Sequence, residues 1–197
     1  VKDPASINNA LVSFKNVMND EYCRDISNKV RASLDRKRSK GEFIGSFASY
    51  GYRKDPADRH HLVIDPAAAE VVRSIYQWFL GGMSIIGIAK KLNQLGVPSP
   101  TMYKKQLGYP YRHPTGELCD GLWPDSSVKR ILKNRIYTGD MVQSKTKIKS
   151  YKVQVCTTVP EEKWIIVPDT HEAVIPREQF ETVQQLLRRD TRTAPGV

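Results

Sequence analysis

The chain has 197 residues, of which 40% are hydrophobic, and a formal net charge of +10 at pH 7. This length fits one domain of ordinary size with an appendage, or two small domains, and the apolar content is sufficient for a core. No apolar run approaches the roughly 18 residues of a membrane span, and no basic-then-apolar leader is present. We therefore expect no membrane segment and a cytoplasmic location. The three cysteines form no CxxC pair, so neither a zinc site nor a disulfide framework is indicated.

The positive charge lies in two blocks. Residues 24–54 hold nine basic and three acidic side chains, and residues 125–152 hold eight basic and two acidic ones, so that each block has a net charge of +6. The rest of the chain has a net charge of about −2. Two basic blocks on a nearly neutral body favour a polyanion-binding surface. The alternative is a pair of solvated faces.

The first predicted element is a long helix. Apolar residues recur every three or four positions from Ile7 to Leu34, and no proline or glycine interrupts residues 5–40. This spacing predicts one helix of about 33 residues. Its apolar face needs a partner that nothing else in the chain is shaped to supply. Its last turns, at 35–40, are almost all charged. Their cations interact favourably with the negative end of the helix dipole and are well placed to meet phosphates.

The next segments are predicted to be a linker, a strand and a helix. Residues 41–56 contain three glycines and interspersed aromatic residues, which indicate an extended linker. A short strand is expected at 62–64. Asp65 and the proline that follows it mark a helix N-terminus, and the apolar spacing up to Phe79 predicts a helix that ends at the glycine pair 81–82.

Residues 84–96 look like the first half of a helix-turn-helix. Ser84 is a suitable N-cap, and Gly96 can take the positive φ that ends a helix. One face of this helix is predicted to be buried, with the spacing of an amphipathic helix: Ile85, Ile88, Ala89, Leu92 and Leu95. The DNA-reading helix is then expected at 123–135. The alternative is an ordinary surface helix in a small bundle.

The second half of the chain is predicted to contain a loop, two helices and a small antiparallel sheet. Residues 97–123 indicate a long irregular loop, which is usually functional. The following helix is expected to be capped by Asp125 or Ser126, to bury residues 128, 131 and 132, and to project its basic residues outward. Strands are predicted at 137–144 and 164–167 with a basic hairpin at 145–159 between them, and Pro176 opens a last helix.

No catalytic constellation is evident. His60 and His61 have no ligand spacing to a cysteine or to an acidic cluster, so we interpret them as surface residues and expect no metal or cofactor. The sequence contains no glycine-rich phosphate loop, no GxSxG and no HExxH. Binding is therefore the favoured function.

Six stretches carry a resemblance to a known family. They are Gly41-Glu-Phe-Ile-Gly, Tyr50-Gly-Tyr-Arg-Lys-Asp, Ile64-Asp-Pro-Ala-Ala-Ala-Glu-Val-Val, Ser84-Ile-Ile-Gly-Ile-Ala-Lys-Lys-Leu-Asn, Val128-Lys-Arg-Ile-Leu-Lys-Asn-Arg-Ile-Tyr-Thr-Gly-Asp and His171-Glu-Ala-Val-Ile. In this order, over roughly residues 20–190, they resemble the recombinase domain of large serine recombinases.

This resemblance implies a mainly helical α+β chain with a winged-helix-like helix-turn-helix domain, which binds double-stranded DNA. It also implies a division into 1–40, the last helix of a catalytic domain; 41–56, a DNA-tracking linker; 57–190, the DNA-binding domain; and 191–197, a linker towards a zinc ribbon. By this resemblance, the full enzyme would cut DNA through phosphoserine linkages as a dimer or tetramer. None of Ser6, Ser13 and Ser27 matches the family's nucleophile motif, so this chain is expected to be inactive alone, with its catalytic serine upstream.

Twelve residues are predicted to contact DNA: Arg36, Lys37, Arg38, Lys40, Arg53, Lys54, Ser126, Ser127, Lys129, Arg130, Lys133 and Arg135. The rival hypothesis is a winged-helix transcription regulator without a catalytic parent, which would bury the apolar face of the first helix within itself or in a coiled dimer.

Overall fold

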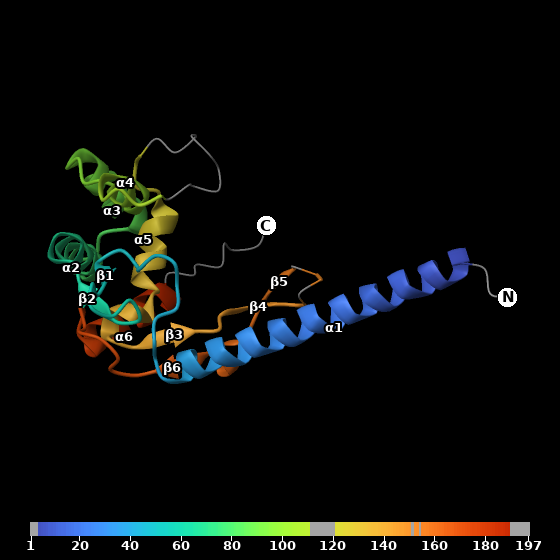
Figure 1. The fold of residues 1–197 in the computed structure, drawn as a ribbon. Helices are drawn as coiled ribbons and strands as arrows, with labels where there is room; N and C mark the ends of the chain where they lie inside the picture. The colour runs from blue at the N-terminus through green and yellow to red at the C-terminus, as the bar shows by residue number, and fades with distance from the viewer. Residues whose placement is uncertain (1–3, 111–120, 151, 154, 190–197) are drawn as a thin grey trace, which may run out of the picture. The chain divides into compact units, whose positions relative to one another are not determined.

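The computed structural model describes residues 4–110, 121–150, 152–153 and 155–189. The chain has an α+β, mainly helical fold, as expected (Figure 1). It divides into two compact units. The helix–hairpin unit comprises Val1–Ile44 and Val142–Val167, and the helical unit comprises Gly45–Met141 and Pro168–Val197. Each unit is a set of residues that lie close to one another in space. The predicted domain boundaries are functional assignments, and they stay a prediction.

The helix–hairpin unit is built from one helix and short strands. Helix α1 (Pro4–Ser39) confirms the predicted long helix. Strands β4 (Thr146–Ile148) and β5 (Cys156–Thr158) pair antiparallel and confirm the hairpin. Strand β3 (Met141–Gln143) pairs with β6 (Ile165–Val167), which follows the short 3-10 helix η2 (Glu161–Lys163). An ion pair of 2.8 Å between Lys152 and Asp20 joins the hairpin connection to α1.

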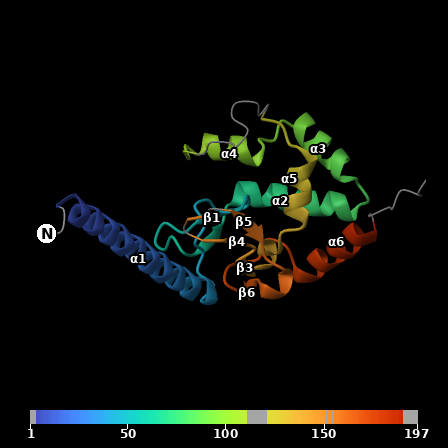
Figure 2. The ribbon, with the colours of Figure 1, turned by 90° about the vertical axis from the view of Figure 1, so that its right-hand side faces the viewer.

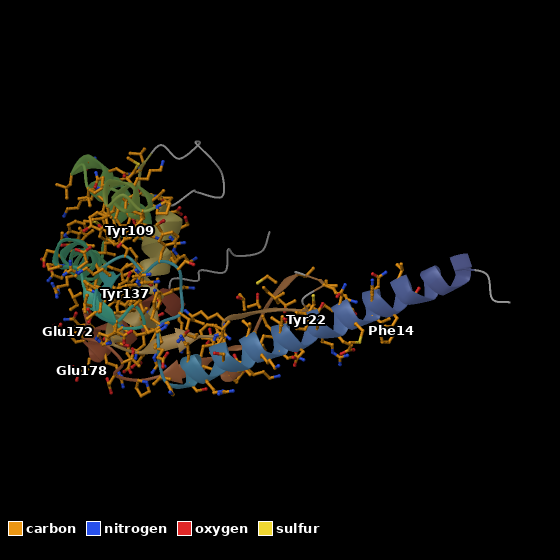
Figure 3. All side chains as sticks on the ribbon, viewed as in Figure 1. Phe14, Tyr22, Tyr109, Tyr137, Glu172 and Glu178 are labelled. Atoms are coloured by element: carbon orange, nitrogen blue, oxygen red, sulfur yellow. The ribbon has the colours of Figure 1, made fainter. Side chains whose placement is uncertain are left out.

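The apolar face of α1 is exposed. The exposed fractions of Phe14, Met18 and Tyr22 are 63%, 56% and 67%, and Figure 3 shows Phe14 and Tyr22 projecting from the helix. The side chains of Ile7 and Leu11, which continue the pattern, lie outside the described residues. Because large apolar side chains in a row are rarely left in water, this face is suited to a partner.

The helical unit begins with a two-stranded antiparallel sheet of β1 (Tyr52–Lys54) and β2 (Leu62–Ile64). Its helices follow as α2 (Pro66–Leu80), α3 (Ile85–Gln94), α4 (Pro100–Gln106), α5 (Asp125–Leu132) and α6 (Arg177–Arg189). Helices α2, α3 and α5 all contact one another, and Figure 2 shows α5 crossing α2. The packing of these three helices forms the core. Each contributes side chains with no more than 1% exposure, among them Ile75, Ile88 and Val128.

The predicted limits of α2 and α3 are confirmed, with one error in the buried face. The Ser84 hydroxyl accepts a 3.1 Å hydrogen bond from the backbone N–H of Gly87, and Gly96 takes a φ of +66°. Leu95, however, is 60% exposed. It is the C-cap residue, beyond the last full turn, so its side chain is not held over the buried face.

The prediction of an irregular stretch at 97–123 is wrong for α4. Ser99 caps this helix and Pro100 occupies its first turn, the same combination that starts α2 at Asp65. The tyrosine and glycine content of the surrounding stretch obscured this signal. Residues 111–120 lie outside the described residues.

The strand predicted at 137–144 is mostly wrong. Residues Arg135–Thr138 form a 3-10 helix, η1, and the strand β3 begins only at Met141. Gly139 separates them with a φ of +87°, and a Cβ at this position would lie 2.8 Å from the backbone oxygen of His171. The chain therefore turns sharply here, at a close approach that excludes any side chain.

Candidate nucleic-acid interface

Helix α5 presents a polar and basic face opposite its buried face. Val128, Ile131 and Leu132 are buried, as their spacing predicts. Ser126, Lys129, Arg130 and Lys133 are exposed, and Ser127 is half-buried. The N-cap of α5 is Pro124, and the helix itself begins at Asp125. The prediction that Asp125 or Ser126 caps this helix is therefore wrong.

The start of α5 is fixed by Trp123, which is 2% exposed. Its indole Nε1 donates a 3.0 Å hydrogen bond to the carbonyl of Val97, and its backbone N–H donates a 2.7 Å bond to Asn93 Oδ1. Asn93 lies at the end of α3. The two helices are thus joined at this point by side-chain hydrogen bonds, which hold the outward face of α5 in a defined orientation.

Arg135 does not lie on α5, contrary to the prediction that this helix extends to it. The helix ends at Leu132, and Arg135 begins η1. Its Nε donates a 2.6 Å hydrogen bond to Asp140 Oδ2, while an Arg177 guanidinium nitrogen lies 2.7 Å from Asp140 Oδ1. Because the Asp140 carboxylate is fully buried, part of the charge of Arg135 is engaged within the fold.

Arg53 and Lys54 lie on strand β1, within the segment that is predicted to be an extended linker. Strand β1 follows the alternation of a sheet edge, with Tyr52 buried, Arg53 exposed and Lys54 half-buried. The Tyr52 hydroxyl donates a 2.9 Å hydrogen bond to the carbonyl of Glu172, and the Tyr52 ring stacks on that of Tyr137 at 6.0 Å. The extended conformation predicted for this segment is confirmed, but its second half belongs to the folded unit.

The cations at the end of α1 belong to the helix–hairpin unit. Arg36 and Lys40 are exposed, and Lys37 and Arg38 are half-buried. Arg38 forms a 2.6 Å ion pair with Asp35, one turn earlier. Because the Asp35 carboxylate of this pair is 59% exposed, the pair contributes at most about 1 kcal/mol.

The prediction missed a cleft in the helical unit, of about 460 Å³, between residues 46–59 and α4. Helix α4 forms one wall because the Tyr103 hydroxyl donates a 2.8 Å hydrogen bond to Asp65 Oδ2. Burial, reinforced by the Asp65 carboxylate, raises the pKa of Tyr103 to about 12. Tyr50 lies edge-on to both Tyr103 and Trp123, at 5.5 and 5.4 Å. The two walls are far apart in sequence, so the sequence could not predict that they meet. It could predict only that a helix begins at Ser99-Pro100.

The cleft is also electropositive. Lys104 lies over the ring of Phe47, 5.2 Å from its centroid. Burial and the nearby Arg130 guanidinium lower the pKa of the Lys104 ammonium group. Lys104 is therefore a partly desolvated cation within the electrostatic influence of a second cation, an arrangement that an anion would stabilise. It also brings the cleft close to Arg130 on the outward face of α5.

The described residues contain no group of three or more histidine, cysteine or acidic side chains suited to a metal ion. None of their helices has the length and apolarity needed to cross a membrane. The described cysteines, Cys23 and Cys156, are exposed free thiols.

Comparison with known proteins identifies the family. Residues 66–190, from the start of α2 to just beyond the end of α6, match the family called Recombinase. The chain belongs to this family. The resemblance to a recombinase domain, drawn from six short motifs, is thereby confirmed.

Individual relatives of this Recombinase-family chain are more distant. The uncharacterized protein YefB of Bacillus subtilis (strain 168) is 31% identical over 94 residues, which are 48% of this chain and 31% of that protein. The chain thus spans about a third of the length of that relative. A structure described as an LSR–DNA complex is 21% identical with a TM-score of 0.48, and the match covers 82% of this chain and 38% of the chain in that structure. A structure concerning the Listeria innocua prophage attP site is 22% identical with a TM-score of 0.47, and the match covers 80% of this chain and 51% of the chain in that structure.

Replacing Arg53 tests the strand as a DNA contact. We expect Arg53→Gln to weaken binding to duplexes of every sequence alike and to reduce the slope of log K against log salt by about one unit, because one phosphate contact is lost. The measurement is fluorescence anisotropy over a salt series. Arg188→Gln on α6, which carries none of the predicted contacts, is the matched control. An unchanged slope for Arg53→Gln would mean that Arg53 contacts no phosphate and that β1 only connects the segments on either side of it.

Proposed function

We propose that this chain binds double-stranded DNA as the recombinase domain of a site-specific serine recombinase. The observation that carries the proposal is membership of the Recombinase family over residues 66–190. Its physical support is the outward face of α5, where Ser126, Lys129, Arg130 and Lys133 are exposed above a buried apolar face. A helix with this distribution fits the major groove, where side chains near its N-terminus meet base edges.

In this proposal α3 and α5 act as a helix-turn-helix. Helix α3 is the supporting helix and α5 the reading helix, and the hydrogen bonds between Asn93 and Trp123 fix one against the other. Arg130 is suited to a bidentate contact with guanine. Lys133, at the C-terminal end, is better placed for a backbone phosphate, as are Arg53 and Lys54 on β1. Four cations at the end of α1 are also assigned to phosphate contacts: Arg36, Lys37, Arg38 and Lys40.

The exposed apolar face of α1 supports a larger assembly. Phe14, Met18 and Tyr22 are each more than half exposed, as expected for a helix that packs against a catalytic domain and a second subunit. The proposed full protein is a dimer that forms a tetramer on DNA and integrates, excises or transposes a mobile element in the cytoplasm. A transcription regulator would instead cover this face within its own fold or in a coiled dimer.

The direct test is binding of the purified chain to labelled duplexes that contain candidate element ends, compared with scrambled duplexes. We expect tighter binding to one half-site than to the scrambled duplex. Footprinting then locates the protected base pairs. Equal affinity for all duplexes would overturn sequence-specific recognition, and no binding at low salt would overturn the proposed function.

The isolated chain is expected to form no covalent bond with DNA. None of its serines matches the family's nucleophile motif, and a phosphoserine linkage needs an activated hydroxyl. Incubation with a nicked suicide substrate, followed by denaturing electrophoresis, should show free DNA only, although the same duplex is bound under native conditions. A shifted band that survives denaturation would contradict this expectation.

A further inference from the structure

The cleft between residues 46–59 and α4 has two chemically distinct parts. Its mouth is apolar, because the Phe47 ring lies edge-on to Tyr109 at 5.9 Å, and Tyr109 and Leu107 are 44% and 50% exposed. Tyr109, labelled in Figure 3, follows α4. The wall formed by residues 46–59 also includes the strand β1, which contributes Arg53 and Lys54. An apolar edge beside a cationic wall matches a sugar joined to a phosphate.

The charge of the cleft is positive. Four cationic side chains line it, Arg53, Lys54, Arg59 and Lys104, against two carboxylates, Asp55 and Asp65. Both carboxylates already accept hydrogen bonds within the fold. Asp55 Oδ1 accepts from the backbone N–H of Ala57 at 2.9 Å, and Asp65 Oδ2 accepts from Tyr103 at 2.8 Å. The cations therefore exceed the acids, and the acids are occupied in holding the walls together.

Two of the cations lie on opposite walls. The guanidinium of Arg53 is close enough to Tyr103 on α4 to lower the pKa of that phenol against the other influences on it. Lys104, the next residue on α4, lines the same cleft and carries a lowered pKa through burial. A phosphate between the two walls would thus meet one cation from each, and its charge would offset the desolvation of Lys104.

We propose that this cleft receives the sugar–phosphate backbone of one strand of the bound duplex, with a phosphate between Lys104 and Arg53 and the adjoining deoxyribose against Phe47 and Tyr109. This inference rests on the proposed function, and it adds α4 to the DNA interface. The proximity of Lys104 to Arg130 places the backbone contact beside the base-reading face of α5. Lys104 is then a positioning residue, which sets the register of α5 on the duplex and carries no base preference itself.

Adjacent lysines on α4 provide a matched pair for the test. Lys104 lines the cleft, whereas Lys105 is exposed and is absent from the described lining. The probe is a fluorescein-labelled duplex of mixed sequence, titrated over a salt series. We expect Lys104→Gln to weaken binding roughly fivefold to tenfold at low salt and to reduce the salt slope by about one unit. Lys105→Gln should leave both unchanged, and Lys104→Arg should restore the slope.

The outcomes separate the cleft from the proposed function. If the wild-type chain fails to bind the duplex, the proposed function falls and this inference with it. If the wild type binds and the two glutamine variants behave alike, the cleft assignment alone is wrong. A titration with dAMP distinguishes the other source of a phosphate: Lys104-dependent binding of the mononucleotide, without a Lys104 effect on the duplex, would make the cleft a small-molecule site. Should Lys104→Gln lose its helical circular dichroism, Tyr109→Ala at the exposed rim replaces it, with the same decrease in affinity expected and an unchanged affinity overturning the inference.

Discussion

Replacing Asp140 by asparagine is expected to lower the free energy of unfolding by about 2–4 kcal/mol. The carboxylate is fully buried and accepts from both Arg135 and Arg177. Loss of one partner of a buried ion pair costs about 3–5 kcal/mol when the other is left buried. Both arginine side chains are nearly half exposed, at 44% and 47%, so water can partly compensate them and the expected loss is somewhat smaller than this range.

Urea unfolding followed by circular dichroism measures this loss as a lower midpoint at unchanged m-value. The control is Asp169→Asn, which removes a carboxylate 3.6 Å from the same Arg177 but 83% exposed. Asparagine tolerates the positive φ of residue 169, so this variant should lose less than about 1 kcal/mol. Equal losses in the two variants would show that the burial of Asp140 is not what makes its ion pairs matter.

Replacing Arg130 by alanine is expected to relax the base preference of the chain at one or two positions while duplex binding persists. A bidentate arginine–guanine contact is worth about 1–3 kcal/mol of discrimination. Arg130 is exposed on α5, one residue before the buried Ile131, so the substitution should leave the fold intact. Selection of binding sites from a randomised duplex pool is the measurement.

Lys133→Ala is the matched comparison for Arg130. It lies at the C-cap of the same helix, where a phosphate contact is expected, so affinity should fall while the selected sequence stays the same. If the Arg130 variant selects the same sequence as the wild type, α5 is not the reading helix. The reader would then be sought in residues 101–122, of which 111–120 lie outside the described residues.

The helices with a clear apolar period were predictable from sequence. Helices α1, α2 and α3 follow their predicted ranges because caps, glycines and periodic apolar residues all indicated the same limits. Helix α4 was missed because its seven residues bury no side chain fully. A short helix without a buried face has little period to detect, and Tyr103 is held through a distant carboxylate, Asp65.

The errors at the candidate site also arise from contacts between distant residues. The sequence indicated that Arg135 was a cation available to DNA, but not that the chain folds Arg177 back towards Asp140 and joins all three. Likewise, the aromatic residues at 47, 50 and 103 indicated no common surface until the two walls of the cleft were placed together. Local spacing predicts the face of a helix, but a cleft between separate segments depends on tertiary packing.

The anchoring of Tyr52 has a thermodynamic consequence for its neighbour Arg53. The Tyr52 hydroxyl accepts from the backbone N–H of Val174 at 3.3 Å and donates to the carbonyl of Glu172, and its ring lies edge-on to His171 at 4.8 Å. The backbone on one side of Arg53 is therefore already ordered in the unbound chain. The local ordering cost of a contact at Arg53 is then the rotamer entropy of one arginine, about 0.5–1.5 kcal/mol, without the added entropy of ordering a flexible strand. At this proposed contact, affinity would be limited by the balance between desolvation of the guanidinium and its attraction to the phosphate. Changes in solvent and salt should therefore alter the affinity more than changes in the stiffness of strand β1.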